Sequence, residues 1–414
     1  MTEETEQDQW KNGWASLRHR DFRVLWAGTF VSNAGSWMQK IATAWLIYHL
    51  TGSQAWLGTD AFASGFTTVV LLPVGGVIAD RLDRRWLLIW TNTACAALAL
   101  VLALLSFAGV LHVWHIITVS ALGGIVQAAM VPASTSLLPA LVGESDVPNA
   151  IALNSLQFNL SRVAGPAIGG LTLVYLGAGW SFAINAASFL VLVAAFMLIR
   201  TVPAVPQGKL PLGRSLLDGL RFIRGRTDLI VMLALVAAIA LLGAPVVSLL
   251  PALVKDVFGR QASSYSFLLT CFGAGAVVAA VASTLLGQRG SGLWAILLAF
   301  VIVGICQVAV LFSTWSLVIV LVFIGGFGFV GAMIRLGTEI LQQTDDAFRG
   351  RVTSVQQICF RAGQPIGALL GGFIGQAWGV RVVFSVFGGV CVAVAVLTAA
   401  INATRCGRAS QRVI

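Results

Sequence analysis

Residues 155–166 read SLQFNLSRVAGP, and residues 354–365 read SVQQICFRAGQP. Ser, Gln, Arg and Pro recur at the same offsets in the two stretches, and a Gly-Gly pair follows each stretch. Both stretches interrupt long apolar runs, where shared positions of Arg and Pro are harder to obtain by chance than shared apolar residues. The pattern therefore predicts that the chain is built from two related halves.

The composition indicates that water is not the main solvent around this chain. Of its 414 residues, 58% are hydrophobic and only 10% are charged, whereas soluble domains carry about 25% charged residues. Apolar runs of about 20 residues, the length of a membrane-spanning helix, occur near residues 22–48, 54–79, 86–108, 113–138, 149–174, 180–199, 228–252, 264–287, 292–313, 316–342, 354–378 and 381–402. We therefore expect an all-α integral membrane protein with 12 transmembrane helices in two pseudo-symmetric six-helix halves.

One long connection divides the chain. Residues 200–227 mix Pro, Gly and basic residues, and their part SLLDGLRFI (215–223) fits either a short interfacial helix or a solvated linker. Two related six-helix halves are typical of secondary transporters, whose substrate site lies near mid-membrane. The expected parts are a cytoplasmic N-terminal segment (1–21), an N-terminal bundle (22–199), the linker (200–227), a C-terminal bundle (228–402) and a cytoplasmic tail (403–414).

The net charge of +10 follows membrane topology and does not indicate nucleic-acid binding. Most of the 26 Lys and Arg residues fall in alternate connections, and only Lys255, Arg260 and Arg381 fall in the others. Because Lys and Arg concentrate on the cytoplasmic side, we expect an inner (cytoplasmic) membrane protein with both termini in the cytoplasm. The cysteines are single and show no metal-ligand spacing, so neither a metal nor a cofactor is expected.

The connection between the second and third expected helices reads GGVIADRLDRR (75–85). Glycine permits close helix approach, and an Asp carboxylate can accept hydrogen bonds at a neighbouring helix N-terminus, so this loop can latch one half to the other. A solvated, positively charged turn is the simpler alternative. The candidate gating residues are Gly76, Asp80, Arg81, Arg84 and Arg85.

This loop resembles the signature loop of the major facilitator superfamily, with Asp83 where most members have Gly. HRDFRVLWAGTFVSNAGSWMQ (19–39), YHLTGS (48–53) and RGRVTSVQ (349–356) are similar to the branch of the bacterial enterobactin exporter and the transmembrane secretion effectors. The resemblance covers essentially the whole chain and implies alternating access, a small-molecule substrate and a functional monomer. The fourth helix reads ALGGIVQAAMVP (121–132) and lacks the arginine of the RxxQG-like motif, so that proton-relay role is not carried over.

The fifth helix contains GPAIGG (165–170), which is similar to the GPxxGG motif of drug/proton antiporters, with Ala152 and Ser161 at two upstream glycine positions. A proline inside a helix removes a backbone hydrogen bond and bends the helix, and glycines permit tight packing. Plain helix packing is the alternative to a pivot. The candidate pivot residues are Gly165, Pro166, Gly169, Gly170 and Pro365.

Charged and aromatic residues inside the spans suggest a substrate cavity. Arg162 lies where a cation costs at least about 2.5 kcal/mol on insertion scales; it can bind a substrate anion or form a breakable ion pair, and a static pair or a snorkelling side chain is the alternative. One face of the first helix carries Trp26, Phe30, Asn33, Trp37 and Lys40, although Lys40 can also reach the outer interface. The candidate cavity residues are Asn33, Trp37, Lys40, Ser64, Thr67, Phe158, Arg162 and Arg361.

Two acidic residues inside expected spans, Asp60 and Glu339, are candidates for proton coupling. Such coupling needs a carboxylate whose protonation responds to burial and to nearby cations. Asp60 can instead cap the outer end of its helix, and Glu339 can pair with Arg335 or with Arg361.

The expected function is proton-coupled, alternating-access export of small amphipathic or aromatic compounds, drug-like or siderophore-like. An importer on the same fold and a lysophospholipid transporter are the alternatives. An enzyme is not expected, because no histidine pairs with a carboxylate on a suitable helical face and no GxSxG, HExxH or phosphate-cradling loop occurs.

Overall fold

The computed structural model describes residues 14–199, 219–286 and 292–411. The first 13 residues of the expected N-terminal segment, linker residues 200–218 and tail residues 412–414 lie outside the described residues. Over the described ranges the chain is helical and contains no strand, which confirms the all-α fold class.

Long helices occupy every predicted span. Before the linker they are α2 (Arg20–Thr51), α3 (Gln54–Arg81), α4 (Arg84–Phe107), α5 (Val113–Leu137), α6 (Val147–Tyr175) and α7 (Ala178–Leu198). After the linker they are α9 (Thr227–Ala252), α10 (Ala262–Leu286), α11 (Leu293–Ala309), α12 (Trp315–Gln342), α13 (Arg349–Trp378) and α14 (Val380–Gln411). Most bounds agree with the prediction to within a few residues, but α14 continues well past the predicted end at residue 402.

Short helical turns join several of these helices. They are η1 (Ala15–Arg18), η2 (Leu138–Leu141), η3 (Glu144–Asp146), the π-helical η4 (Leu253–Val257), η5 (Val310–Phe312) and η6 (Asp346–Phe348). Residues 219–224 of the linker are also helical, which fits the interfacial-helix alternative for that part of the linker.

Nine of the described helices are long and apolar enough to cross a membrane. The other three long helices are α2, α6 and α13, which carry Lys40, Arg162 and Arg361 among other polar residues. Charged side chains inside a span normally face a partner or a wet cavity. The less apolar helices are therefore the ones in which a polar site is expected.

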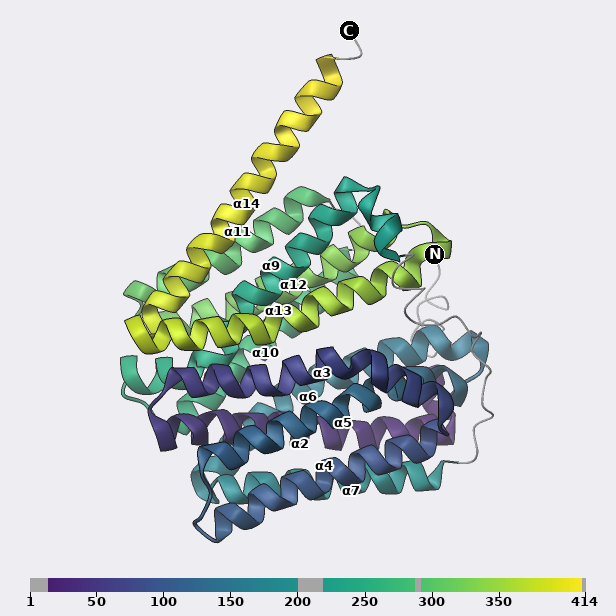
Figure 1. Ribbon diagram of the computed structural model, residues 1–414, viewed down its shortest axis with the longest axis vertical. Coiled ribbons are helices and arrows are strands. Elements are labelled where there is room, and N and C mark those ends of the chain that lie inside the picture. The colour runs from purple at the N-terminus through teal and green to yellow at the C-terminus, as the bar shows by residue number, and fades with distance from the viewer. Residues whose placement is uncertain (1–13, 200–218, 287–291, 412–414) are drawn as a thin grey trace, which may run out of the picture. The chain divides into compact units, whose positions relative to one another are not determined.

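The chain forms two compact units. Unit 1 contains Met1–Leu50 and Thr67–Lys209, and unit 2 contains Thr51–Phe66 and Leu210–Ile414. Within each unit the first helix packs on the fifth, the second on the fourth and the third on the sixth. The pairs are α2–α6, α3–α5 and α4–α7 in unit 1, and α9–α13, α10–α12 and α11–α14 in unit 2. Figure 1 shows α4 running alongside α7, and α9 near α13.

Corresponding glycines make two of these contacts. A Cβ on Gly75 of α3 would overlap the carbonyl of Ala128 in α5, and a Cβ on Gly275 of α10 would overlap the carbonyl of Phe323 in α12. Glycine allows the two backbones to approach this closely. The repeated helix pairing, with glycine at the same kind of contact, supports the prediction of two pseudo-symmetric halves.

One helix is shared by the two units. The part of α3 up to Phe66 belongs to unit 2, and the part from Thr67 onward belongs to unit 1. Within unit 2, Gly65 lies against the ring of Pro365, and the Gln54 amide donates a hydrogen bond to Gln376 Oε1 at 3.0 Å. The first part of α3 is therefore held against α13.

Candidate functional site

The aromatic stripe of α2 packs along α6 inside unit 1. Gly165 of α6 lies so close to α2 that a Cβ there would be 2.5 Å from the Trp37 Cβ and 2.7 Å from the Ala34 carbonyl oxygen. Nearer the start of α2, Trp26 Nε1 donates a hydrogen bond to the Leu153 carbonyl at 2.9 Å. The stripe is therefore fixed on α6 at two separate places.

Two cations lie over the ring of Trp37. Lys40 Nζ is 5.0 Å and Arg162 Cζ is 5.6 Å from the ring centroid, and both distances fall within the range of about 6 Å for cation–π attraction. Lys40 is exposed and Arg162 is half-buried. An indole ring beside two positive charges suits a ligand that has an aromatic ring and a negative charge.

A chain of neutral polar groups lies on the same two helices. Asn33 Nδ2 donates to Gln157 Oε1 at 3.4 Å, and Gln157 Nε2 donates to Ser161 Oγ at 3.1 Å. Ser161 Oγ also donates to the Phe30 carbonyl at 3.2 Å, which leads back to α2. Gln157 and Ser161 are only 1% and 0% exposed. This row of buried hydrogen bonds therefore holds Asn33 against α6.

Neither Gln157 nor Ser161 is among the predicted site residues. The sequence does hold a signal for Gln157, because it stands at an offset that the repeat shares with Gln356. A further polar contact, Asn185 Nδ2 to Gln39 Oε1 at 2.7 Å, joins α7 to α2. Contacts of this kind depend on how helices pack and leave no pattern within a single span.

The remaining predicted cavity residues of α3 and α6 are Phe158, Ser64 and Thr67. Phe158 is 47% exposed on α6, one turn before Arg162. Thr67 and Ser64 are half-buried on α3, and they belong to unit 1 and unit 2 respectively. The structure thus brings together Asn33, Trp37, Lys40 and Arg162. A substrate-binding role stays a prediction for all the candidate cavity residues.

Arg361 occupies the position in unit 2 that corresponds to Arg162. It is half-buried on α13, which packs on α9 with Gly363 against Ala237 and Ala240. The sequence of α9 contains no aromatic residue, and its one charged residue, Asp228, stands in the first turn. The helix paired with Arg361 therefore offers no counterpart of the indole and lysine that lie near Arg162.

The two candidate coupling acids also belong to unit 2. Asp60 is half-buried on the first part of α3, and Glu339 is half-buried on α12. Glu339 Oε1 accepts a hydrogen bond from Gln343 Nε2 at 2.8 Å, one turn along the same helix. Pairing of Glu339 with Arg335 or Arg361 stays a prediction.

The candidate gating loop has local structural roles in unit 1. Asp83 caps α4, because its Oδ1 accepts a hydrogen bond from the Trp86 amide at 3.0 Å. Arg85 donates from Nε to the Phe196 carbonyl and from Nη2 to the Met197 carbonyl, each at 2.8 Å, and a cation at the C-terminal end of α7 is electrostatically favourable. The other loop candidates are half-buried or exposed: Gly76, Arg84, Asp80 and Arg81. A latch to the other half stays a prediction.

The candidate pivot residues are packed against other helices. Gly169 lies against Met38 of α2, and Pro365 lies against Gly65 of α3. The helices α6 and α13 continue through their prolines. All the pivot candidates are buried: Gly165, Pro166, Gly169, Gly170 and Pro365. The structure shows the packing role, and the pivot stays a prediction.

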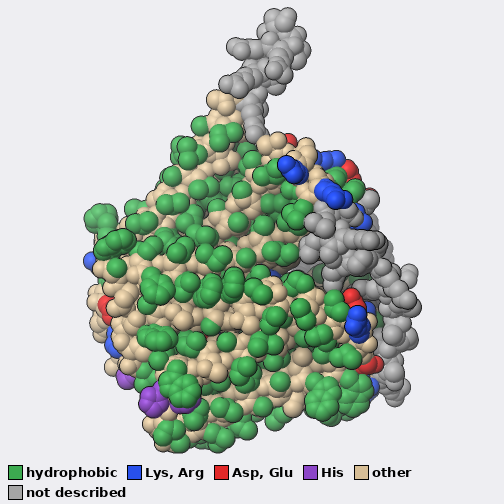
Figure 2. All heavy atoms as spheres, in the orientation of Figure 1, with side chains coloured by type: hydrophobic (Ala, Val, Ile, Leu, Met, Phe, Trp, Pro, Cys, Tyr) green, Lys and Arg blue, Asp and Glu red, His purple; other side chains and the backbone are tan. Residues whose placement is uncertain are grey.

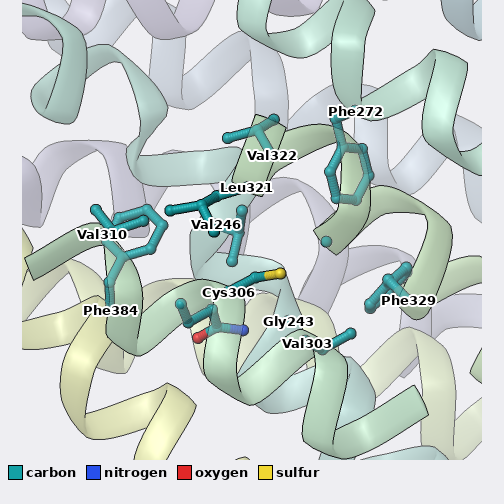
Figure 3. A pocket seen from close by; sticks show the side chains of 12 residues that line it. Gly243, Val246, Phe272, Val303, Cys306, Val310, Leu321, Val322, Phe329 and Phe384 are labelled. Carbon is teal, nitrogen blue, oxygen red and sulfur yellow. The ribbon is translucent and has the colours of Figure 1, made fainter. Parts of the chain in front are cut away.

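Unit 2 contains a small apolar cavity, shown in Figure 3. Gly243, Cys306 and Phe329, from three different helices, form part of its wall, and its volume is about 20 Å³. That volume holds about one water molecule, whereas pockets for drug-sized ligands measure about 300–1,000 Å³. No predicted site residue lines this cavity, so we do not assign the substrate to it.

Comparison with known proteins identifies a family and relatives of this chain. The family model described as transmembrane secretion effector matches residues 11–411. The enterobactin exporter EntS of Shigella boydii serotype 18 is 27% identical over 362 residues, which cover 86% of this chain and 86% of that protein. The enterobactin exporter EntS of Escherichia coli O6:K15:H31 is 28% identical over the same length and with the same coverage.

Solved structures share the fold at low sequence identity. The nucleoside transporter NupG superposes with a TM-score of 0.74 and 15% identity, covering 92% of this chain and 98% of that chain. A POT family transporter in complex with 5-aminolevulinic acid gives a TM-score of 0.72 and 12% identity, covering 92% and 96%. A bacterial homologue of the human lysosomal transporter Spinster, inward-facing and unoccupied, gives a TM-score of 0.69 and 16% identity, covering 92% of this chain and 94% of that chain. At these identities the likeness shows the fold alone.

Proposed function

Because the chain belongs to the transmembrane secretion effector family of major facilitator transporters, we propose that it exports small aromatic or amphipathic compounds that carry a negative charge. It is a multi-pass membrane transporter and not an enzyme. The observation that carries the proposed substrate class is the Trp37 ring with Lys40 and Arg162 over it. Stacking on the indole favours an aromatic group, and the two cations favour an anion.

Enterobactin is the first substrate to test, because the curated relatives are named as its exporters. Identity of 27–28% leaves room for a different compound of the same chemical class. Two things therefore support a siderophore-like or drug-like substrate: the names of the relatives and the Trp37 site of this chain.

Alternating access between the two halves is the proposed mechanism. The shared helix α3 supports it, because its first part packs on α13 in unit 2 while its second part packs in unit 1. A rearrangement of the two units must therefore bend α3 near residues 66–67 or separate its first part from α13. Gly58 and Gly65 have no side chains at this contact, so few interdigitating side chains have to separate there.

Proton antiport is the proposed energy source, with Asp60 and Glu339 as the coupling acids. Both are half-buried carboxylates on helices of unit 2. In the proposed topology both termini are cytoplasmic and the protein acts as a monomer in the inner membrane. The halves at 22–199 and 228–402 and the cytoplasmic segments at 1–21, 200–227 and 403–414 belong to the same proposal.

Transport into inside-out vesicles tests the substrate class. Vesicles from cells that express the full chain, with an acidic interior, are expected to accumulate enterobactin, and Trp37→Ala is expected to lower the initial rate about 10-fold because the stacking surface is lost. Trp90→Phe is the control, since Trp90 of α4 is 67% exposed. Wild-type rates in Trp37→Ala would refute the site, and accumulation of a fluorescent lysophospholipid in place of enterobactin would establish the lipid alternative.

The same vesicles test direction and coupling. Asp60→Asn and Glu339→Gln are expected to abolish accumulation driven by the pH gradient but to retain substrate exchange without a gradient, because exchange needs no net proton movement. Asp256→Asn, an exposed acid, is the control. If both variants still concentrate substrate on the acidic side, neither residue couples transport to protons; accumulation only in right-side-out vesicles would indicate an importer.

A further inference from the structure

A pair of stacked aromatic rings joins the linker to the connection between α12 and α13 in unit 2. The rings of Phe222 and Phe348 have centroids 4.3 Å apart and an interplanar angle of 10°. Phe222 lies in the helical residues 219–224, and Phe348 ends η6, directly before α13. The stack therefore holds the last part of the linker at the point where α13 begins.

Arginines flank this stack on both sides. Arg226 Cζ lies 4.4 Å from the Phe222 ring, and Arg351 Cζ lies 5.2 Å from the Phe348 ring. Arg226 also donates to the Gln343 carbonyl at 3.0 Å and to Asp345 Oδ2 at 2.8 Å. These contacts fix the positions of two guanidinium groups, those of Arg226 and Arg351, in unit 2.

The helical residues 219–224 present an exposed basic face. Gly219 and Ile223 are buried, and a Cβ on Gly219 would lie 3.0 Å from the Cβ of Arg351. On the other side, Arg221 and Arg224 are exposed and Leu220 is 50% exposed. Arg221 and Arg224 are three residues apart, so their side chains are neighbours on the helix surface. A short helix with buried, apolar and basic faces is suited to the membrane interface.

The position along the chain sets the depth of this face in the membrane. The apolar run of α9 begins at Leu229 and continues to Val254 without a charged residue, so Arg221 and Arg224 precede the hydrocarbon-spanning part by only a few residues. Residues at this distance from a span lie near the lipid headgroups. The arginines outnumber the acids over residues 219–228 and 343–351. Figure 2 shows Lys and Arg side chains at the upper right, with Asp and Glu side chains beside them.

We propose that Arg221 and Arg224, on the helix that the Phe222–Phe348 stack positions, form a binding site for the phosphate groups of anionic phospholipids. Guanidinium groups bind phosphate oxygens in a bidentate manner, and exposed Leu220 contacts the acyl chains directly below the headgroup. The site is separate from the proposed substrate site on α2 and α6. It requires only that the chain spans a membrane, so it stands whichever compound is transported.

Lipid titration of the full-length protein tests this site. Phosphatidylglycerol and phosphatidylcholine are added to the purified protein in neutral detergent, and bound lipid is measured by native mass spectrometry together with the melting temperature. We expect phosphatidylglycerol to bind more tightly than phosphatidylcholine. Arg221→Gln together with Arg224→Gln is expected to weaken phosphatidylglycerol binding about 25-fold, about fivefold for each arginine near a membrane surface. If the double variant fails to fold, Arg224→Gln alone is expected to weaken binding about fivefold.

Arg260→Gln is the matched control. Arg260 is also an exposed arginine of unit 2 that lies over an aromatic ring, 4.3 Å from the ring centroid of Trp315, and its removal changes the net charge by the same amount as Arg224→Gln. Phosphatidylglycerol binding in Arg260→Gln is expected to match the wild type. Equal binding of the two lipids, unchanged binding in the arginine variants or an equal loss in Arg260→Gln would overturn the proposal. Displacement of the lipid by millimolar inorganic phosphate would identify a site for free phosphate and would also overturn it.

Discussion

The helix pairs α2–α6 and α9–α13 have the same packing but different chemistry. In both pairs the second helix carries Gln, Arg and Pro at matching offsets, with the Gln and Pro buried and glycine at the contact. The first helices differ, because α2 presents Trp26, Phe30 and Trp37 whereas α9 has no aromatic residue. The repeated residues therefore set the packing, and the polar site depends on residues that only one half possesses.

The two arginines show the consequence of this difference. Arg162 lies over Trp37 within its own helix pair, so part of the cost of a cation inside a span is offset there. Arg361 is half-buried on a helix whose partner, α9, has no aromatic residue and carries its one charged residue, Asp228, in the first turn. We infer that Arg162 serves substrate recognition more directly than Arg361 does.

The largest effect is expected from exchanging these arginines for glutamine. Arg162→Gln is expected to weaken binding of an aromatic anion about 10- to 100-fold, because an interaction with a charged group contributes about 1.5–3 kcal/mol. Arg361→Gln is expected to change the affinity by less than about threefold. Binding of enterobactin is measured by fluorescence quenching with each purified variant.

Arg162→Lys provides the internal control for that comparison, because it keeps the charge but lacks the planar fork of arginine. An intermediate affinity is expected for it. If Arg361→Gln weakens binding as much as Arg162→Gln does, the two halves contribute equally to recognition and the inferred asymmetry is wrong.

The spans could be predicted from the sequence, and the site could be predicted only in part. Apolar runs bounded by polar turns mark helix ends directly, so most of the observed bounds agree with the prediction. The predicted span for α14 ends with the apolar run at residue 402, whereas the helix continues through polar residues to Gln411. The stripe on α2 follows from helical periodicity. The position of Arg162 over Trp37 could not be predicted from periodicity, because it depends on the rotation of α6 about its axis relative to α2.

Arg85 and Gln157 show that the role of a residue can depend on a partner far away in the sequence, which a motif does not reveal. Arg85 belongs to a loop whose pattern suggests gating, but its guanidinium binds the last carbonyls of α7, a partner more than 100 residues away. Gln157 is neutral, and a neutral polar residue inside a span gives a weaker signal than a charge. Its burial between Asn33 and Ser161 becomes visible only when α2 and α6 are placed together.

A second comparison concerns the glycines at the two contacts. Gly165→Ala is expected to lower the free energy of unfolding by about 1–3 kcal/mol, because the new Cβ would be 2.5 Å from the Trp37 Cβ and 2.7 Å from a backbone oxygen. Gly363→Ala is expected to cost less, since its Cβ would be 2.9 Å from the Ala240 Cβ and 3.0 Å from the Ala237 oxygen. Thermal unfolding in detergent measures both.

Substrate affinity separates the two glycine variants further. Gly165→Ala must displace Trp37 and is expected to weaken enterobactin binding, whereas Gly363→Ala is expected to leave binding unchanged at a temperature where both are folded. Unchanged binding in Gly165→Ala would mean that the Trp37 ring keeps its place independently of the α2–α6 contact.

The smallest effect is expected from the repeated glutamines, Gln157 and Gln356. Gln157→Met keeps the volume of the side chain but removes its hydrogen bonds with Asn33 and Ser161. Only the bond with Asn33 holds a candidate substrate-site residue, and one neutral hydrogen bond is worth about 1 kcal/mol, so about a fivefold rise in KM with kcat unchanged is expected. Gln356→Met, buried at the corresponding position of α13, is expected to leave KM unchanged because no aromatic stripe lies on α9. Initial transport rates over a range of substrate concentrations distinguish the two. An equal rise in KM for both variants would show that the glutamines act through the packing common to both halves, and Asn33 would then have no separate part in recognition.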